Sequence, residues 1–185
     1  MALLCEAGLR PYHHLLDVGA GSLRLGCKAL SYLDPGHYWA TDASRALMLR
    51  GREAELDDPA RLSPEHLIED ADFAYPGVPA RIDFALAFAV FTHLPADRLA
   101  AALTRARAVF PDLRAYLFTV FLAPVSAVSQ AWRQADGVVT HPDRPPYHQT
   151  QEAVFALVRD AGFAAELTDT LLPRGQRLFL ARPVR

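Results

Sequence analysis

Short apolar runs of strand length alternate with stretches of helical periodicity along the whole sequence. Chains with this alternation build βα repeats, because two parallel strands need a crossover between them, which is usually a helix. The sequence therefore predicts an α/β fold with a mostly parallel sheet. Strands are expected at 13–18, 37–41, 65–69, 82–89 and 114–121, and helices at 22–32, 44–56, 95–108 and 149–161.

Three of these helices begin with residues that favour a helix start. Ser22 and Ser44 are good N-cap residues, and Pro95 with Asp97 suits the first turn of the third helix. The link at 71–82 is different, because it contains two prolines and a glycine. We therefore expect the crossover helix between the third and fourth strands to be missing or reduced.

The region after the fifth predicted strand has the least regular pattern. Residues 122–148 contain four prolines and no clear periodicity, which is typical of a loop that holds a substrate or covers a site. After the helix at 149–161, two apolar stretches at 163–169 and 176–182 are joined by only a few residues. A link this short predicts that these last two strands are antiparallel.

Composition limits the classes of protein to which the chain can belong. With 185 residues, 51% of them hydrophobic, residues 1–185 are enough for one domain with a full-sized core. The formal net charge of −2 gives no general attraction to nucleic acid or to an anionic membrane, so neither partner is expected. No apolar run reaches the roughly 18 residues of a membrane span, and residues 1–16 do not resemble a signal peptide. Cys5 and Cys27 cannot form a disulfide framework, and no cluster has metal-site spacing, so we expect a cytoplasmic protein without a metal.

The stretch at 15–26, LLDVGAGSLRLG, places a glycine turn directly after an apolar strand. Gly19 and Gly21, on either side of Ala20, let the backbone approach a ligand closely. A dinucleotide fingerprint would have a third glycine at position 24, where Arg24 stands, and the Gly-Lys-Ser/Thr of a P-loop is absent. Asp17, two residues before the turn, suits a cationic ammonium group better than a pyrophosphate.

Acidic residues also stand at the ends of the next two strands. Asp42, followed by Ala43, comes 21 residues after Gly21, where a carboxylate can accept hydrogen bonds from both ribose hydroxyls. Asp70 can accept from an adenine amino group while the N–H of Ala71 reaches a ring nitrogen, although neighbouring Asp72 competes for that role. A ligand that combines adenosine with an amino acid fits all these groups, and S-adenosylmethionine (SAM) is such a molecule. Phe88 could place an aromatic face near its sulfonium.

The sequence contains, in order, LLDVGAGSLRLG, YWATDAS, IDFALAFAVFTHLP and PRGQRLFLAR, which span Leu15 to Arg182. Together these stretches resemble the class I SAM-dependent methyltransferases, in particular a bacterial branch with G-S-L-R after the glycine turn and F-T-H-L-P after the fourth strand. The resemblance implies a Rossmann-like, seven-stranded sheet whose last strand is inserted antiparallel. It also implies that five residues line the SAM pocket: Asp17, Gly19, Gly21, Asp42 and Asp70.

The chain departs from that family pattern in three places. Ala20 replaces a Cys or similar residue, which is a harmless change, and Leu172 stands where members often have His. Only about a dozen residues precede the first predicted strand, so the helices that commonly roof a methyltransferase pocket are nearly absent. The substrate must then be held by 122–148, by a second subunit, or hardly at all. An exposed pocket makes a homodimer a reasonable expectation.

Three residues are candidates for catalysis. His93 follows the fourth strand, where the chemistry of open α/β sheets takes place, but it could instead cap the next helix or bind a backbone carbonyl. Tyr147 and His148 precede the last helix and are expected at the pocket mouth. Because SAM carries an already activated methyl group, the protein chiefly aligns an acceptor and removes a proton, and histidine is the usual base near pH 7.

The predicted function is transfer of a methyl group from SAM to oxygen or nitrogen of a small molecule. One alternative is a methyltransferase that acts on protein or nucleic acid, which the open top favours and the lack of a basic run opposes. Another is a protein that binds SAM without transferring its methyl group. A nucleotide-dependent reductase fits least, because Arg24 replaces the third glycine and Asp17 would repel a pyrophosphate.

Overall fold

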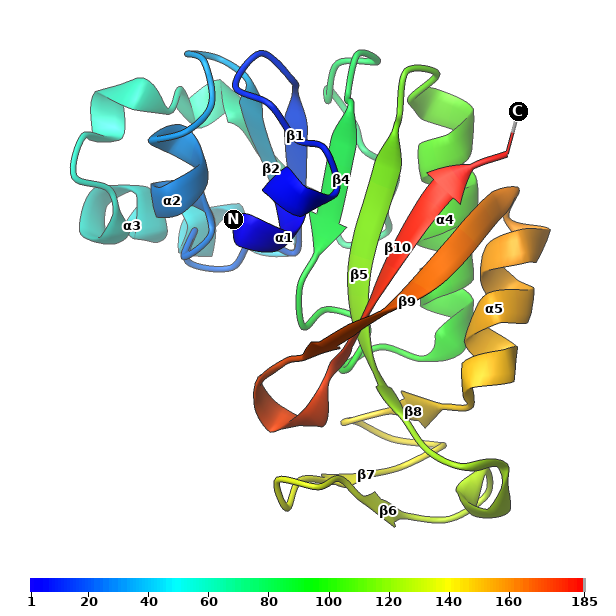
Figure 1. Cartoon of the computed structure of the whole chain (residues 1–185). Helices are drawn as coiled ribbons and strands as arrows, with labels where there is room; N and C mark the ends of the chain where they lie inside the picture. The colour runs from blue at the N-terminus through cyan, green and yellow to red at the C-terminus, as the bar shows by residue number, and fades with distance from the viewer. Residues whose placement is uncertain (185) are drawn as a thin grey trace.

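The computed structural model of the protein describes residues 1–184, and a twisted sheet with helices on both faces forms its centre (Figure 1). The strand order is β3-β2-β1-β4-β5-β10-β9, and β8 pairs with the end of β5. The strands are β1 (Leu15–Val18), β2 (Tyr38–Asp42), β3 (Leu67–Glu69), β4 (Phe84–Ala87), β5 (Ala115–Leu122), β8 (His148–Gln149), β9 (Phe163–Leu171) and β10 (Arg177–Pro183).

Most neighbouring strands are parallel, and the exception is β10. β1 pairs in parallel with β2 on one side and β4 on the other, while β10 lies antiparallel between β5 and β9. The prediction of a mostly parallel sheet with an inserted antiparallel last strand is confirmed. All five predicted parallel strands are present within a few residues of their expected bounds. β1, β4 and β5 are apolar runs buried on both faces, whereas β3 at the sheet edge is only partly buried.

Helices α1 to α3 cover one face of the sheet, and the remaining two helices cover the other (Figure 1). The alternation of side chains along β1 decides which residues meet which helices. Leu15 belongs to the core between the sheet and α1 to α3, whereas Leu16 and Val18 belong to the core on the opposite face. The helices are α1 (Ala2–Glu6), α2 (Gly26–Leu30), α3 (Arg45–Glu55), α4 (Ala96–Val109) and α5 (Gln151–Asp160).

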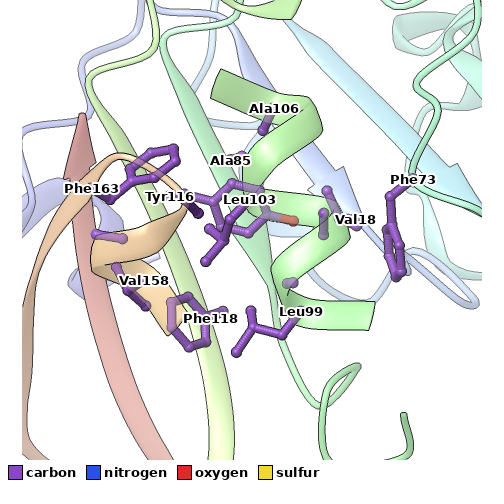
Figure 2. Close-up of a cluster of buried hydrophobic side chains, with 14 of the residues drawn as sticks. Val18, Phe73, Ala85, Leu99, Leu103, Ala106, Tyr116, Phe118, Val158 and Phe163 are labelled. Carbon is purple, nitrogen blue, oxygen red and sulfur yellow. The ribbon is translucent and has the colours of Figure 1, made fainter. Parts of the chain in front are cut away.

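Figure 2 shows the core that holds α4 and α5 against the sheet. Leu99 and Leu103 from α4 and Val158 from α5 are fully buried against Tyr116 and Phe118 of β5. Fully burying a side chain of this size stabilises a fold by about 1.5–3 kcal/mol. This core fixes β5, whose carboxyl end contributes to the candidate site.

The helix predicted at 22–32 is wrong in length, because α2 has only five residues, Gly26–Leu30. Gly21 and Leu23 both adopt left-handed backbone conformations, with φ of 54° and 63°, so the chain turns here instead of entering a helix. Ser22 therefore caps nothing. By contrast, Ser44 caps α3 as predicted, since its hydroxyl accepts a hydrogen bond from the N–H of Leu47.

The link between β3 and β4 contains no helix in the described structure, as its prolines predict. The Asp70 carboxylate organises this loop by accepting hydrogen bonds from the N–H groups of Asp72, Ala74 and Tyr75 at 2.8–3.1 Å. The loop thus replaces helical hydrogen bonds with bonds to one side chain.

Residues 122–148, called the lid segment below, are more ordered than the sequence predicts. The segment contains a short 3-10 helix, η3 (Val125–Ala127), and a hairpin of β6 (Trp132–Arg133) with β7 (Val139–Thr140). It lies beyond the carboxyl end of β5 (Figure 1), where the N–H of Tyr147 donates to the carbonyl of Thr92 at 2.8 Å. Within residues 1–184 no helix has both the length and the apolar character that a membrane crossing needs.

Candidate active site

A cavity of about 780 Å³ opens on the face of the sheet that α1 and α2 cover. Its floor comes from inward-facing residues of four neighbouring strands: Asp17 of β1, Leu86 of β4, Leu117 of β5 and Leu178 of β10. The lid segment contributes Val138 and Pro146 to its wall. The cavity therefore lies near the carboxyl ends of the parallel strands, where ligands bind in open α/β sheets.

The glycine turn forms one end of the cavity. Gly19 has a φ of 68°, and a Cβ atom on it would lie 2.4 Å from Cγ2 of Val90. The N–H groups of Gly19 and Ala20 donate to the Thr41 carbonyl at 2.7 and 3.0 Å, and that of Gly21 donates to Oδ2 of Asp42 at 2.9 Å. These three donors are already used within the protein, so the turn does not present them to a phosphate group.

Asp17 is the acidic group of the cavity wall, and it is only 4% exposed. The Tyr38 hydroxyl donates to its Oδ2 at 2.7 Å, while Oδ1 accepts no hydrogen bond from residues 1–184. Burial raises the pKa of the Asp17 carboxyl to about 7; the Tyr38 hydrogen bond opposes this shift, and the nearby Asp42 carboxylate adds to it. A cationic group in the cavity would restore the charged form.

Asp42 and Ala43 lie outside the cavity wall, at the end of neighbouring β2. The Asp42 carboxylate accepts from the N–H of Gly21 and, at 2.9 Å through Oδ1, from the N–H of Ser44. It thereby connects the glycine turn to the start of α3. Ala43 is exposed.

Asp70 and Ala71 lie one strand further, at the end of β3. Three backbone N–H groups already occupy the Asp70 carboxylate, and Ala71 is exposed. The alternative residue, Asp72, forms an ion pair with Arg98 at 2.9 Å. The structure thus places the predicted ribose and adenine residues along one sheet edge, next to the cavity and outside it.

Among the predicted catalytic residues, His93 alone contributes to the cavity wall, and its side chain is exposed. The backbone N–H of His93 donates to the Val90 carbonyl at 3.0 Å. Phe88, predicted near the sulfonium, also lines the cavity and is 43% exposed. These two residues and the glycine turn are brought together by the structure.

The structure corrects the expectation that Tyr147 and His148 face the pocket mouth, because neither lines the cavity. His148 pairs with Phe121 in the β5–β8 ladder and is only 5% exposed. Its Nδ1 lies 2.9 Å from the Thr140 hydroxyl, which ties β8 to the β6–β7 hairpin. Burial lowers the pKa of the His148 ring, so the neutral form is favoured.

Sequence reasoning missed several polar residues of the cavity wall. Arg24 and Lys28 follow the glycine turn, and Arg174 with Gln176 comes from the connection between β9 and β10. The PRGQ letters at 173–176 belong to the resemblance, but only the insertion of β10 beside β5 brings them to the cavity. Within residues 1–184, no three His, Cys, Asp or Glu side chains gather in a group that could hold a metal ion.

Several solved structures are similar to this chain over nearly its whole length. The magnesium protoporphyrin IX methyltransferase of Synechocystis PCC 6803, with bound SAM, has a TM-score of 0.67 at 16% sequence identity, over 99% of this chain and 76% of its own. DhpI in a SAM complex has a TM-score of 0.68 at 16% identity, over 98% of this chain and 84% of its own. The 1,6-didemethyltoxoflavin-N1-methyltransferase of Burkholderia thailandensis, bound to S-adenosylhomocysteine (SAH), has a TM-score of 0.68 at 20% sequence identity. The match covers 100% of this chain and 76% of that protein's chain.

The fold is therefore that of the class I SAM-dependent methyltransferases. By sequence, no protein-family model matches the chain, and no curated protein matches it. Identities of this size show a common fold, and function has to be argued from the site.

Proposed function

We propose that the protein is a SAM-dependent methyltransferase that transfers a methyl group to oxygen or nitrogen of a small molecule. The observation that carries the proposal is the buried Asp17 carboxylate, which stands beside a glycine turn whose N–H groups are already bonded. This arrangement favours a cation over a phosphate. The similar structures support the proposal, since they include methyltransferases of small molecules with SAM or SAH bound.

The residues present fit SAM. Oδ1 of Asp17 would accept from the ammonium group, and Arg24 or Lys28, both in the cavity wall, would bind the carboxylate of SAM. Each oxygen of Asp42 accepts only one backbone hydrogen bond, so further lone pairs are left for the ribose hydroxyls. The Asp70 carboxylate has about four lone-pair sites, and three of them accept backbone hydrogen bonds. The remaining site would accept from the adenine amino group, beside the N–H of Ala71.

When bound, SAM supplies a methyl group that is already activated by its positive sulfur. The chain must then orient the acceptor, exclude water and accept a proton. Phe88 offers an aromatic face to a positive charge, and His93 takes the proton of an acceptor hydroxyl or amine at a ring nitrogen. The lid segment, through Val138 and Pro146, closes the cavity over the acceptor.

Binding of SAM or SAH is the first test. At a ligand concentration of 100 times Kd, either compound is expected to stabilise the protein by about 2.7 kcal/mol, a rise in melting temperature of about 5–10 °C. NAD⁺ at the same concentration should give no rise. A thermal shift with NAD⁺ and none with SAM or SAH would contradict the proposal.

Asp42→Ala is expected to abolish the thermal shift caused by SAH. The substitution removes the acceptor for the Gly21 N–H and the oxygens proposed for the ribose. Asp57→Ala is a matched control, because Asp57 is an exposed acid in the link after α3 and does not line the cavity. An undiminished SAH shift in Asp42→Ala would remove Asp42 from the proposed site.

His93→Ala is expected to lower kcat about 10²–10⁴-fold while leaving the Kd for SAH unchanged, because a base acts on the acceptor only. Transfer of labelled methyl from SAM to small molecules of a metabolite extract measures the activity. His141→Ala is the control, since His141 belongs to the lid segment but does not line the cavity. A His93→Ala variant with full activity would exclude His93 as the base. A protein that binds SAM and forms no SAH with any acceptor would be a SAM-binding protein without transferase activity.

We also propose that the chain belongs to the branch with G-S-L-R and F-T-H-L-P motifs. The first motif contains Leu23, whose left-handed backbone ends the glycine turn. The second contains Thr92, whose hydroxyl donates to the Ala89 carbonyl, and His93 of the cavity wall. A cytoplasmic location, a single domain over 1–185 and a homodimer stay predictions; size-exclusion chromatography with light scattering would test the homodimer.

A further inference from the structure

The connection between β9 and β10 presents one basic and one amide side chain to the cavity. Arg174, in the short 3-10 turn η4 (Pro173–Gly175), has a φ of 65°, which residues with a side chain rarely adopt. A Cβ atom on the next residue, Gly175, would lie 3.3 Å from Cβ of Gln134 in the lid segment. The connection is therefore packed against the lid, and both enclose this end of the cavity.

A buried chain of hydrogen bonds fixes the orientation of the Gln176 amide. The N–H of Ala89 donates to the Thr119 hydroxyl at 2.7 Å, and that hydroxyl donates to Oε1 of Gln176 at 2.8 Å. The opposite orientation of the amide would leave the buried hydroxyl hydrogen without an acceptor. Nε2 of Gln176, which has no partner among the described residues, is thus a donor in the cavity wall.

Charge at the two ends of the cavity differs. At the end of the glycine turn, Asp17 can pair with the ammonium group of SAM, and Arg24 or Lys28 can pair with its carboxylate. Arg174 precedes β10, which is three strand positions from β1, a distance of about 14 Å. Arg174 therefore lies at the far end of the cavity from Arg24 and Lys28. Exposed Asp136 of the lid segment lies near this end too, with Oδ1 3.7 Å from the position of a Cβ atom on Gly175, and it forms no ion pair with Arg174 among the described residues. The Arg174 guanidinium is thus available to an anion in the cavity.

Both polar groups at this end are donors, and the surrounding wall is apolar. Leu117 and Phe121 of β5 and Leu178 of β10 line the same cavity. Arg174 is exposed and Gln176 is buried, so a ligand in the cavity meets a mobile guanidinium and a fixed amide donor. A carboxylate can accept from a guanidinium and an amide together, whereas a neutral ligand gains no charge-assisted bond from Arg174.

We propose that the methyl acceptor is a small organic acid with an apolar, ring-sized body, and that Arg174 and Nε2 of Gln176 bind its carboxylate. The inference rests on the proposed methyltransferase function and names the substrate class of the same cavity. It makes Arg174 and Gln176 specificity-determining residues and leaves proton removal to His93.

Matched pairs of an acid and its amide test the proposal with protein saturated with SAH. Calorimetry would compare 4-hydroxybenzoate with 4-hydroxybenzamide, and indole-3-acetate with indole-3-acetamide. In at least one pair the acid is expected to bind about tenfold more tightly than the amide. Arg174→Gln should remove this preference, while Arg50→Gln, which removes an exposed charge from α3, should preserve it.

Gln176→Glu separates charge recognition from a purely structural role. One carboxylate oxygen of the glutamate can still accept from the Thr119 hydroxyl, so the buried hydrogen bond is retained. The other oxygen replaces the donor with a negative charge, and the acid should now bind at least about tenfold more weakly than in the unmodified protein. Retention of the SAH thermal shift shows that the variant is folded.

The outcomes separate this inference from the proposed function. If SAH does not bind, the proposed function fails and the inference fails with it. If SAH binds but neither acid binds more tightly than its amide, the inference is overturned and the proposed function stands. An acid preference that survives both Arg174→Gln and Gln176→Glu also overturns it, because other residues would then bind the anion.

Discussion

Replacing Gly19 with alanine is expected to destabilise the protein by about 2–4 kcal/mol and to abolish binding of SAM or SAH. About 1–2 kcal/mol arises from the left-handed backbone, whose φ is 68°. A further 1–2 kcal/mol or so arises because the new Cβ would lie 2.4 Å from Cγ2 of Val90, a β-branched residue with little rotamer freedom. Urea denaturation measures the free energy of unfolding, and calorimetry measures SAH binding.

Gly21 provides a matched control in the same turn. It also has a positive φ, of 54°, but a Cβ atom there would meet no atom within 4 Å. Gly21→Ala is therefore expected to cost only about 1–2 kcal/mol. If both substitutions destabilise equally, close approach to Val90 is not the reason for glycine at position 19.

A second substitution can restore the space that alanine takes at position 19. Val90→Ala removes the Cγ2 atom, so the double variant should recover about 1–2 kcal/mol relative to Gly19→Ala alone. Residues in contact are expected to show such coupling. Strictly additive effects would contradict the proposed contact.

The affinity for SAM is expected to fall about fiftyfold between pH 7 and pH 5, because the ammonium group binds the ionised form of Asp17. With a pKa of about 7, half of this carboxyl is ionised at pH 7 and about one hundredth at pH 5. Calorimetric titration across this range measures the effect. Asp17→Asn should bind SAM weakly, and its affinity should not depend on pH in this range. If the affinity of this variant still falls between pH 7 and pH 5 as it does in the unmodified protein, Asp17 is not the titrating group.

Without ligand, the same carboxyl makes folding less favourable as the pH rises. Its pKa is about 7 in the folded protein and 3.8 ordinarily, so between these values the folded state binds more protons than the unfolded state. The stability present below about pH 4 is therefore lost as the pH rises through 7, by about 4 kcal/mol in total. Asp17→Asn should be more stable than the unmodified protein at pH 8 by about 2–4 kcal/mol, as measured by urea denaturation. Equal stability at pH 8 would show that the buried charge has no cost.

The sequence predicted the secondary structure well where the information is local. The apolar runs of β1 to β5 and the cap at Ser44 are read from neighbouring residues, and each is present. The truncation of α2 could not be predicted, because it depends on a contact between distant segments. A Cβ atom on Gly51 of α3 would lie 2.3 Å from the Ser22 carbonyl, so α3 presses closely against the turn that replaces the first part of that helix.

The candidate site shows the same division. Asp17, the glycine turn and His93 could be named from the sequence, because each lies in the last residues of a predicted strand or in the loop that follows it. The placement of His148 could not be predicted from the sequence, because its burial results from pairing with β5. A side chain next to a predicted loop can face either side of it.

By itself, the sequence determined the α/β class, the glycine turn and the acid that precedes it, because apolar periodicity and backbone freedom are properties of short segments. Only the tertiary structure decided what else surrounds the ligand cavity. Arg174 and Gln176 are more than 140 residues from Gly19 and Gly21, and they reach the cavity because β10 is inserted beside β5. Long-range strand pairing depends on the packing of the whole sheet. The tertiary structure therefore determined where the two hydrogen-bond donors that we propose for the substrate lie.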